Sequence, residues 1–128
     1  VDNPDDPESW RKAVKPNTKA FFGETIANPK NEILDIKAIA DVAHSVGVPL
    51  IVDNTVATPY LIKPIDFGAD VVVHSATKFL SGHGNAVVGA IIDAGKFDYA
   101  QHQRQKNKSR KSRCRRGVAG QEYPAIRD

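Results

Sequence analysis

The sequence contains few residues that could cross-link the chain or anchor it in a membrane. Its 128 residues include a single cysteine, Cys114, so an intramolecular disulfide is excluded and a reducing compartment such as the cytoplasm is expected. No apolar run approaches the roughly 20 residues of a membrane-spanning helix. Methionine is absent even at position 1, and the acidic start does not resemble a signal peptide. We therefore expect a processed or truncated chain.

Common ligand-binding motifs are absent as well. The sequence has no G-x-x-x-x-G-K-[ST] phosphate loop and no G-x-G-x-x-G dinucleotide motif. His44 and His83 are scattered and have no cysteine near them, so their spacing predicts no metal site. The chemistry of this chain therefore has to come from other residues.

Basic residues are concentrated at the C-terminal end. Residues 101–128 hold 9 Lys and Arg against 2 Asp and Glu, whereas residues 1–100 hold 9 against 13. The tail has almost no apolar periodicity, so we expect residues 100–128 to be basic and disordered. Such a tail can bind polyanions non-specifically. Apart from Tyr123 it lacks interleaved aromatic residues, so we do not expect a selected nucleic-acid partner.

Apolar patterning predicts an α/β fold with a mostly parallel sheet and flanking helices. Ile36, Ile39, Ala40 and Ala43 form one stripe of a helix, and Asp35 precedes it as a candidate N-cap. Continuous apolar runs are typical of strands that are covered on both faces. The predicted strands are TKAFFGE, VPLIVD, ADVVVHS and AVVGAIID.

Polar residues follow two of these strands, at the edge where parallel sheets collect ligands. Asp53 ends the run LIVD, and Ser75, Thr77 and Lys78 follow VVVH. A lysine desolvated at a strand end can attack an aldehyde to form a Schiff base. Hydroxyl groups can bind a phosphate, and a carboxylate can hold a protonated pyridine nitrogen. These are the parts of a pyridoxal phosphate site.

The same residues also have simpler interpretations. A lysine after a strand is usually a solvated loop residue, and Asp53-Asn54 at a strand end is usually turn chemistry. His74, inside VVVHSA, is more typical of a hydrogen-bonded core residue than of a catalytic base. Residue types and spacing alone therefore do not select the pyridoxal phosphate interpretation.

Longer stretches resemble the Cys/Met metabolism pyridoxal-phosphate enzymes, the cystathionine gamma-synthase family. The similarity runs from about residue 7 to residue 99. It includes ETIANP, VPLIVDNTVATPYLIKPIDFGADVVVHSATKFLSGHG and VVGAIID. The resemblance implies that residues 1–99 are part of the large cofactor domain of a fold-type I pyridoxal phosphate enzyme.

The resemblance also implies roles for individual residues. Lys78 would be the Schiff-base lysine and later the proton shuttle between substrate carbons. Asp53 would pair with the pyridinium nitrogen, while Ser75 and Thr77 would bind the cofactor phosphate. Asn28, in the E-T-x-x-N-P match, would contact the ring hydroxyl and the region of the substrate carboxylate.

Within the family, VPLIVDNTVATPYL and GHGN favour the sulfhydrylase branch. The implied reaction is a gamma-replacement, in which O-acetylhomoserine or O-succinylhomoserine reacts with sulfide to give homocysteine in methionine biosynthesis and transsulfuration. The related cystathionine gamma-synthase and gamma-lyase activities are alternatives. Family members are homo-oligomers whose neighbouring subunit completes each active site.

The chain also departs from the family pattern. Members are longer and bring further phosphate ligands, a tyrosine that stacks on the ring and an arginine that binds the substrate carboxylate. After Tyr99 the resemblance stops. We therefore expect the isolated chain to turn over little or no substrate. An alternative of another class is an inert truncated product whose basic tail binds polyanions.

Overall fold

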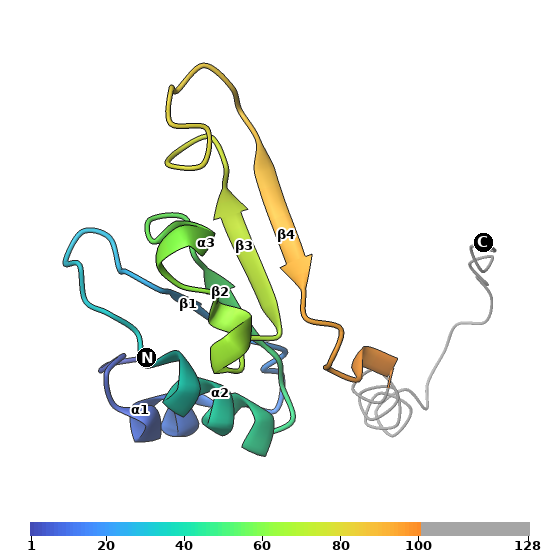
Figure 1. Cartoon of the computed structure of the whole chain (residues 1–128). Helices are drawn as coiled ribbons and strands as arrows, with labels where there is room; N and C mark the ends of the chain where they lie inside the picture. Colours follow the sequence, from blue (N-terminus) through green and yellow to red (C-terminus); the bar gives the residue numbers. More distant parts are fainter. Residues whose placement is uncertain (101–128) are drawn as a thin grey trace, which may run out of the picture. The chain divides into compact units, whose positions relative to one another are not determined.

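The computed structural model describes residues 1–100, of which Val1–Phe97 form one compact unit (Figure 1). Apart from Ala100, the tail predicted over residues 100–128 lies outside the described part. None of the described helices is long and apolar enough to cross a membrane. The elements are α1 (Pro7–Ala13), β1 (Phe21–Glu24), α2 (Ile36–Ser45), β2 (Leu50–Asp53), α3 (Thr58–Leu61), η1 (Pro64–Phe67), β3 (Val71–Ser75) and β4 (Gly89–Asp93).

The four strands form one sheet in the order β1-β2-β3-β4. The first three strands are parallel, and β4 runs antiparallel to β3. Helix α2 connects β1 to β2, and α3 with η1 connects β2 to β3, as parallel pairing requires. The predicted α/β class with a mostly parallel sheet is confirmed.

Helix α2 supplies the predicted apolar stripe to the core. Ile36, Ile39, Ala40 and Ala43 are all buried. Asp35 caps the helix, because its side chain accepts a hydrogen bond from the backbone nitrogen of Ala38 at 3.0 Å. Local sequence signals therefore fix the position of this helix and the face that it buries.

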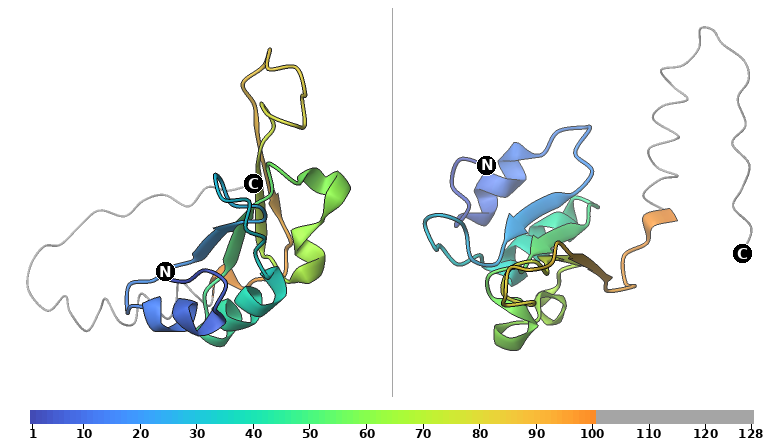
Figure 2. Two further views of the ribbon diagram at one scale, coloured as in Figure 1. Left: turned by 90° about the vertical axis from the view of Figure 1, so that its left-hand side faces the viewer. Right: turned by 90° about the horizontal axis from the view of Figure 1, so that it is seen from above.

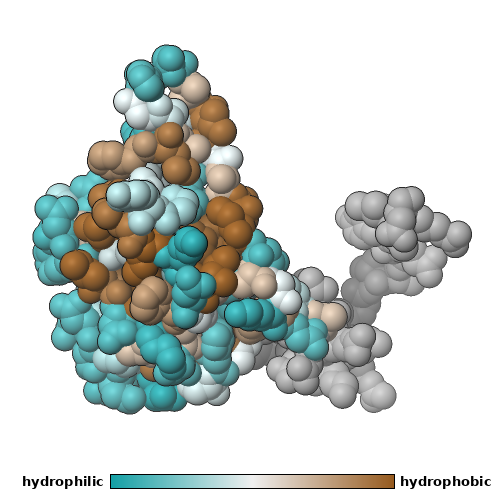
Figure 3. All heavy atoms as spheres, in the orientation of Figure 1, coloured by the Kyte–Doolittle hydropathy of each residue, from teal (hydrophilic) through white to brown (hydrophobic). Residues whose placement is uncertain are grey.

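The sheet is covered fully on one face and partly on the other. Leu50, Val52 and Val72 are buried on the face that packs against α2 and η1. Side chains alternate along strands, and on the opposite face Phe22 is 57% exposed and Ile91 79% exposed. Figure 3 shows apolar side chains at the surface beside β3 and β4. The expectation that both faces are covered is therefore wrong for the described residues, because their helices pack on one face.

Two buried contacts close the ends of this core. The centroid of the Trp10 ring on α1 lies 5.3 Å from the centroid of the Phe21 ring on β1. Asp70, which is 4% exposed, accepts hydrogen bonds from the backbone nitrogen of Leu50 and from Nε2 of His44, both at 2.8 Å. The Asp70 carboxylate thus ties the start of β3 to the start of β2 and to the end of α2.

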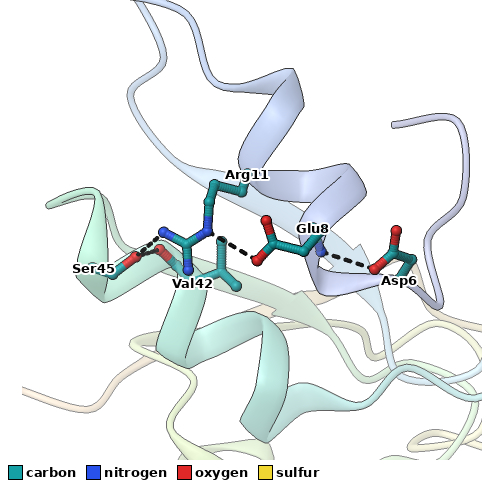
Figure 4. A network of polar contacts seen from close by, with 5 residues as sticks. All are labelled: Asp6, Glu8, Arg11, Val42 and Ser45. Carbon is teal, nitrogen blue, oxygen red and sulfur yellow. Dashed lines mark hydrogen bonds and ion pairs between the residues drawn. The ribbon is translucent and has the colours of Figure 1, made fainter.

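Helix α1 is held against α2 by a polar network as well (Figure 4). Arg11 Nη1 donates to Ser45 Oγ at 3.0 Å, and that hydroxyl donates to the Val42 carbonyl at 2.7 Å. Arg11 Nε also donates to Glu8 Oε1, and the Glu8 backbone nitrogen donates to the N-cap Asp6. These contacts are exposed or partly buried, so they orient α1 more than they stabilise it.

We predict that the buried stripe, rather than the surface, carries the stability of this unit. Ile39→Ala should lower the free energy of unfolding by about 2–5 kcal/mol, because Ile39 is 1% exposed and its removal leaves a cavity. Ile33→Ala is the matched control, since Ile33 is 73% exposed, and it should cost less than about 1 kcal/mol. Urea unfolding of the 128-residue chain measures both. Equal losses would contradict this account of the core.

Candidate active site

The three parallel strands end together at one edge of the sheet. In register, Glu24 at the end of β1 lies opposite Asp53 at the end of β2, and β3 ends at Ser75. A pocket of about 270 Å³ lies at this edge. It is lined by Glu24, Ile26, Asn28, Asp53, Thr55, Val56, Ser75, Lys78 and Phe79. The structure therefore brings together four of the five predicted site residues, Asn28, Asp53, Ser75 and Lys78.

Asp53 serves both as a turn residue and as part of the pocket. Its Oδ1 accepts hydrogen bonds from the backbone nitrogen of Thr55, at 2.9 Å, and from the Thr55 hydroxyl. This is the Asx-turn chemistry that an aspartate at a strand end favours. Its second oxygen, Oδ2, has no hydrogen-bond partner within residues 1–100. Half of the carboxylate is therefore held by the turn, while the other half is available to a ligand.

Ser75 and Lys78 reach the pocket from β3 and the turn that follows it. The Lys78 backbone nitrogen donates to the Ser75 carbonyl at 3.1 Å, and the Gly82 nitrogen donates to the Lys78 carbonyl at 2.9 Å. Gly82 adopts a φ of +70°, a conformation that favours glycine. Figures 1 and 2 show the loop of residues 76–88 projecting beyond the sheet.

Lys78 is exposed, contrary to the expectation that it is desolvated at a strand end. The reason is that β3 ends at Ser75, so a turn rather than the sheet carries the lysine. Its ammonium group makes no ion pair with the described residues, which leaves the nitrogen accessible.

Thr77 is the predicted site residue that does not line the pocket. Its hydroxyl accepts a hydrogen bond from the Val88 nitrogen at 2.9 Å and donates to the Val88 carbonyl at 3.2 Å. The Thr77 backbone nitrogen also donates to the Val88 carbonyl. In this structure the residue therefore closes the base of the loop of residues 76–88.

Glu24 is a pocket residue that the sequence analysis missed. Its Oε2 accepts a hydrogen bond from the Asn28 backbone nitrogen at 2.9 Å, which ties the loop after β1 to the sheet edge. Asn28 itself is exposed and lines the pocket. The available signal was that Glu24 begins the ETIANP stretch, four residues before the asparagine.

His74 lies elsewhere. It is 5% exposed and lines a different pocket, of about 220 Å³, next to α3 and η1. Its predicted burial is confirmed, but its Nδ1 has no hydrogen-bond partner among residues 1–100. Within the same residues no three His, Cys, Asp or Glu side chains form a metal-binding group.

The donor set at the sheet edge fits pyridoxal phosphate. An accessible amine on Lys78, a carboxylate oxygen on Asp53 and a hydroxyl group on Ser75 surround one pocket. The amine can form a Schiff base with the aldehyde of the cofactor, and the carboxylate can pair with its protonated pyridine nitrogen. Hydroxyl or amide groups can donate hydrogen bonds to its phosphate. The Ser75 hydroxyl has no other partner in the described residues, so it is free to donate.

Comparison with known proteins agrees with this chemistry. A family model described as "Cys/Met metabolism PLP-dependent enzyme" matches residues 1–114. The chain belongs to this family. The match confirms the resemblance seen in the sequence, and it extends past Tyr99.

Individual relatives refine the comparison. The chain is 63% identical over 99 residues to an O-acetyl-L-homoserine sulfhydrylase of Corynebacterium glutamicum, covering 77% of this chain and 23% of that protein. It is 51% identical over 94 residues to an L-methionine gamma-lyase of Porphyromonas gingivalis, covering 73% of this chain and 23% of that protein.

A solved structure shows the same fold. It belongs to a Campylobacter jejuni protein described as an O-acetylhomoserine (thiol)-lyase and contains N'-pyridoxyl-lysine-5'-monophosphate. The TM-score is 0.71 at 43% identity, over 74% of this chain and 23% of that one. The chain thus spans about a quarter of the length of the relatives it matches.

We predict that Glu24 holds the Asn28 loop at the pocket. Glu24→Ala should speed hydrogen exchange at the Asn28 amide by about three- to tenfold, because the amide loses its acceptor. Glu24→Gln keeps a carbonyl acceptor and should exchange more like the unmodified chain. Glu32→Ala, which removes an exposed carboxylate near Lys30, is the control. Unchanged exchange in Glu24→Ala would show that the bond does not order the loop.

Proposed function

We propose that this chain carries the pyridoxal-phosphate-binding part of an enzyme that makes homocysteine from O-acetylhomoserine and sulfide. The observation that carries the proposal is the convergence of Lys78, Asp53 and Ser75 on one pocket at the carboxyl edge of the sheet. The sulfhydrylase of Corynebacterium glutamicum is more similar to this chain than is the gamma-lyase of Porphyromonas gingivalis. This favours the sulfhydrylase reaction over elimination, with O-succinylhomoserine as the alternative substrate.

The proposed roles are those that the family resemblance implies, and the presence of Lys78, Asp53, Ser75 and Asn28 at one pocket supports them. Bound pyridoxal phosphate supplies an electron sink for a carbanion at the substrate's α carbon. Asp53 Oδ2 would hold the ring nitrogen, and the Lys78 amine would hold the aldehyde until the substrate's amine replaces it. The released Lys78 amine would then be free to take the α proton. The Ser75 hydroxyl binds the phosphate, and Asn28 contacts the ring hydroxyl and the substrate. Thr77 serves as a second phosphate ligand if its hydroxyl leaves Val88.

The described part of the chain lacks features that turnover requires. Lys78 is exposed, so water has access to the amine and to any carbanion beside it. The chain spans about a quarter of its relatives, and we propose that a cytoplasmic homo-oligomer of the longer protein completes the site. We therefore expect the 128-residue chain by itself to bind the cofactor but to show little or no turnover.

Cofactor trapping tests the proposed site directly. We expect that incubation with pyridoxal phosphate, followed by borohydride reduction and peptide mapping, labels Lys78 stoichiometrically. The label should disappear in Lys78→Ala and fall at least tenfold in Asp53→Ala, because the ring nitrogen loses its charged partner. Lys63→Ala, which removes an exposed lysine outside this pocket, should label normally. Label scattered over the lysines of residues 101–128, or no label, would overturn the proposal.

Turnover is expected to be absent or very low in the isolated chain. Homocysteine formation from O-acetylhomoserine and sulfide should stay within about tenfold of the rate with free pyridoxal phosphate. The reason is that the exposed site neither fixes the orientation of the substrate nor excludes water, and both contribute to an enzyme's acceleration. The assay compares the chain with its Lys78→Ala variant. Fast turnover that depends on Lys78 would show that the quarter-length chain is a complete catalyst.

A further inference from the structure

Thr55 connects the two strand ends that carry the proposed site. It follows β2 by two residues and lines the pocket next to Asp53 and Ser75. Its hydroxyl accepts a hydrogen bond from the Ser75 backbone nitrogen at 2.8 Å and also contacts Asp53 Oδ1. Its backbone nitrogen donates to the same Oδ1 at 2.9 Å. One threonine thus bridges the carboxylate on β2 and the last residue of β3.

The direction of these hydrogen bonds follows from the chemistry of the groups. A backbone N–H group can only donate, so the Ser75 amide donates its hydrogen to the oxygen of the Thr55 hydroxyl group. The single hydroxyl proton is then directed to Asp53, whose oxygen accepts it. Oδ1 therefore receives two donors, which fix the rotation of the carboxylate. Oδ2 is therefore the carboxylate oxygen that remains available to a ligand.

The bridge also links Asp53 to the start of the turn that carries Lys78. Ser75 is the residue at which β3 passes into the turn that carries Lys78. Holding the Ser75 nitrogen on Thr55 keeps the start of that turn beside Asp53. Without the hydroxyl, the partly buried Ser75 amide would lose its acceptor, and Asp53 Oδ1 would keep only the Thr55 backbone amide as a donor. Both groups would then be less firmly held.

We propose that Thr55 is a positioning residue of this site. Its hydroxyl orients the Asp53 carboxylate and fixes the origin of the Lys78 turn. The Asp53 carboxylate and the start of the turn that carries Lys78 are then held beside each other at the pocket. The part of the proposal that concerns the cofactor rests on the proposed function, whereas the bridge itself is a property of the chain without any ligand.

Two variants separate the hydroxyl from the shape of the side chain. Thr55→Val replaces the hydroxyl with a methyl group of similar size, and Thr55→Ser keeps the hydroxyl. Thr18→Val is the matched control, because the Thr18 hydroxyl also accepts a backbone amide bond, from Lys15, at 2.9 Å. That bond is an exposed turn contact outside the residues that line the pocket.

The first test uses the 128-residue chain without cofactor. In Thr55→Val we expect hydrogen exchange at the Ser75 amide to accelerate about tenfold, with a changed ¹³C signal of the Asp53 carboxyl group. Thr55→Ser and Thr18→Val should match the unmodified chain at both positions. If Thr55→Val fails to fold, Thr55→Ala removes the same hydroxyl without adding a methyl group beside Asp53. Unchanged Ser75 exchange and an unchanged Asp53 signal in the variants without the hydroxyl would overturn the proposal.

The second test adds pyridoxal phosphate. Its dissociation constant should rise about tenfold in Thr55→Val and return to within about threefold of the unmodified value in Thr55→Ser. An unmodified chain that binds no pyridoxal phosphate would overturn the proposed function, and the cofactor-free test would still decide the role of Thr55. Equal affinity in Thr55→Val and the unmodified chain would refute positioning of the cofactor.

Discussion

The parallel register of β1, β2 and β3 is the constraint on which the site depends. Glu24 lies opposite Asp53, and Asp53 lies opposite Val73, two residues before Ser75. Because side chains alternate along a strand, a slip of one residue would turn β3 over. Ser75 would then leave the pocket, and His74 would take its place. The convergence of functional groups is therefore a consequence of strand pairing.

This register is fixed at both ends of the strands. At their starts, the buried Asp70 carboxylate accepts the Leu50 amide, so β3 begins beside the start of β2. At their ends, the Thr55 hydroxyl accepts the Ser75 amide. The apolar residues between these contacts pack under α2 and hold the strands together. Apolar packing on one face of the sheet thus stabilises the strand register, and this register positions the pocket residues on the other face.

The sequence predicted the parts of this arrangement that depend on local pattern. The stripe of α2, the four strands and the position of Asp53 follow from periodicity and turn chemistry, and they are confirmed. The exposure of Lys78 and the bond between Thr77 and Val88 were not predicted. Thr77 and Val88 are eleven residues apart, and Thr55 and Ser75 are twenty apart, so no local pattern reports these contacts. These hydrogen bonds form only when the strands pair.

The open face of the sheet links folding to the completion of the site. By the alternation of side chains, Phe22 and Ile91 lie on the same face as Asp53 and Ser75, and both are largely exposed. Burying the exposed part of either side chain would contribute about 1–2 kcal/mol of stability. Phe79, which lines the pocket with Lys78, is 65% exposed as well, so polypeptide that covers it would also remove water from the pocket. The exposed apolar surface therefore supplies a driving force for covering the sheet edge at which Lys78 lies.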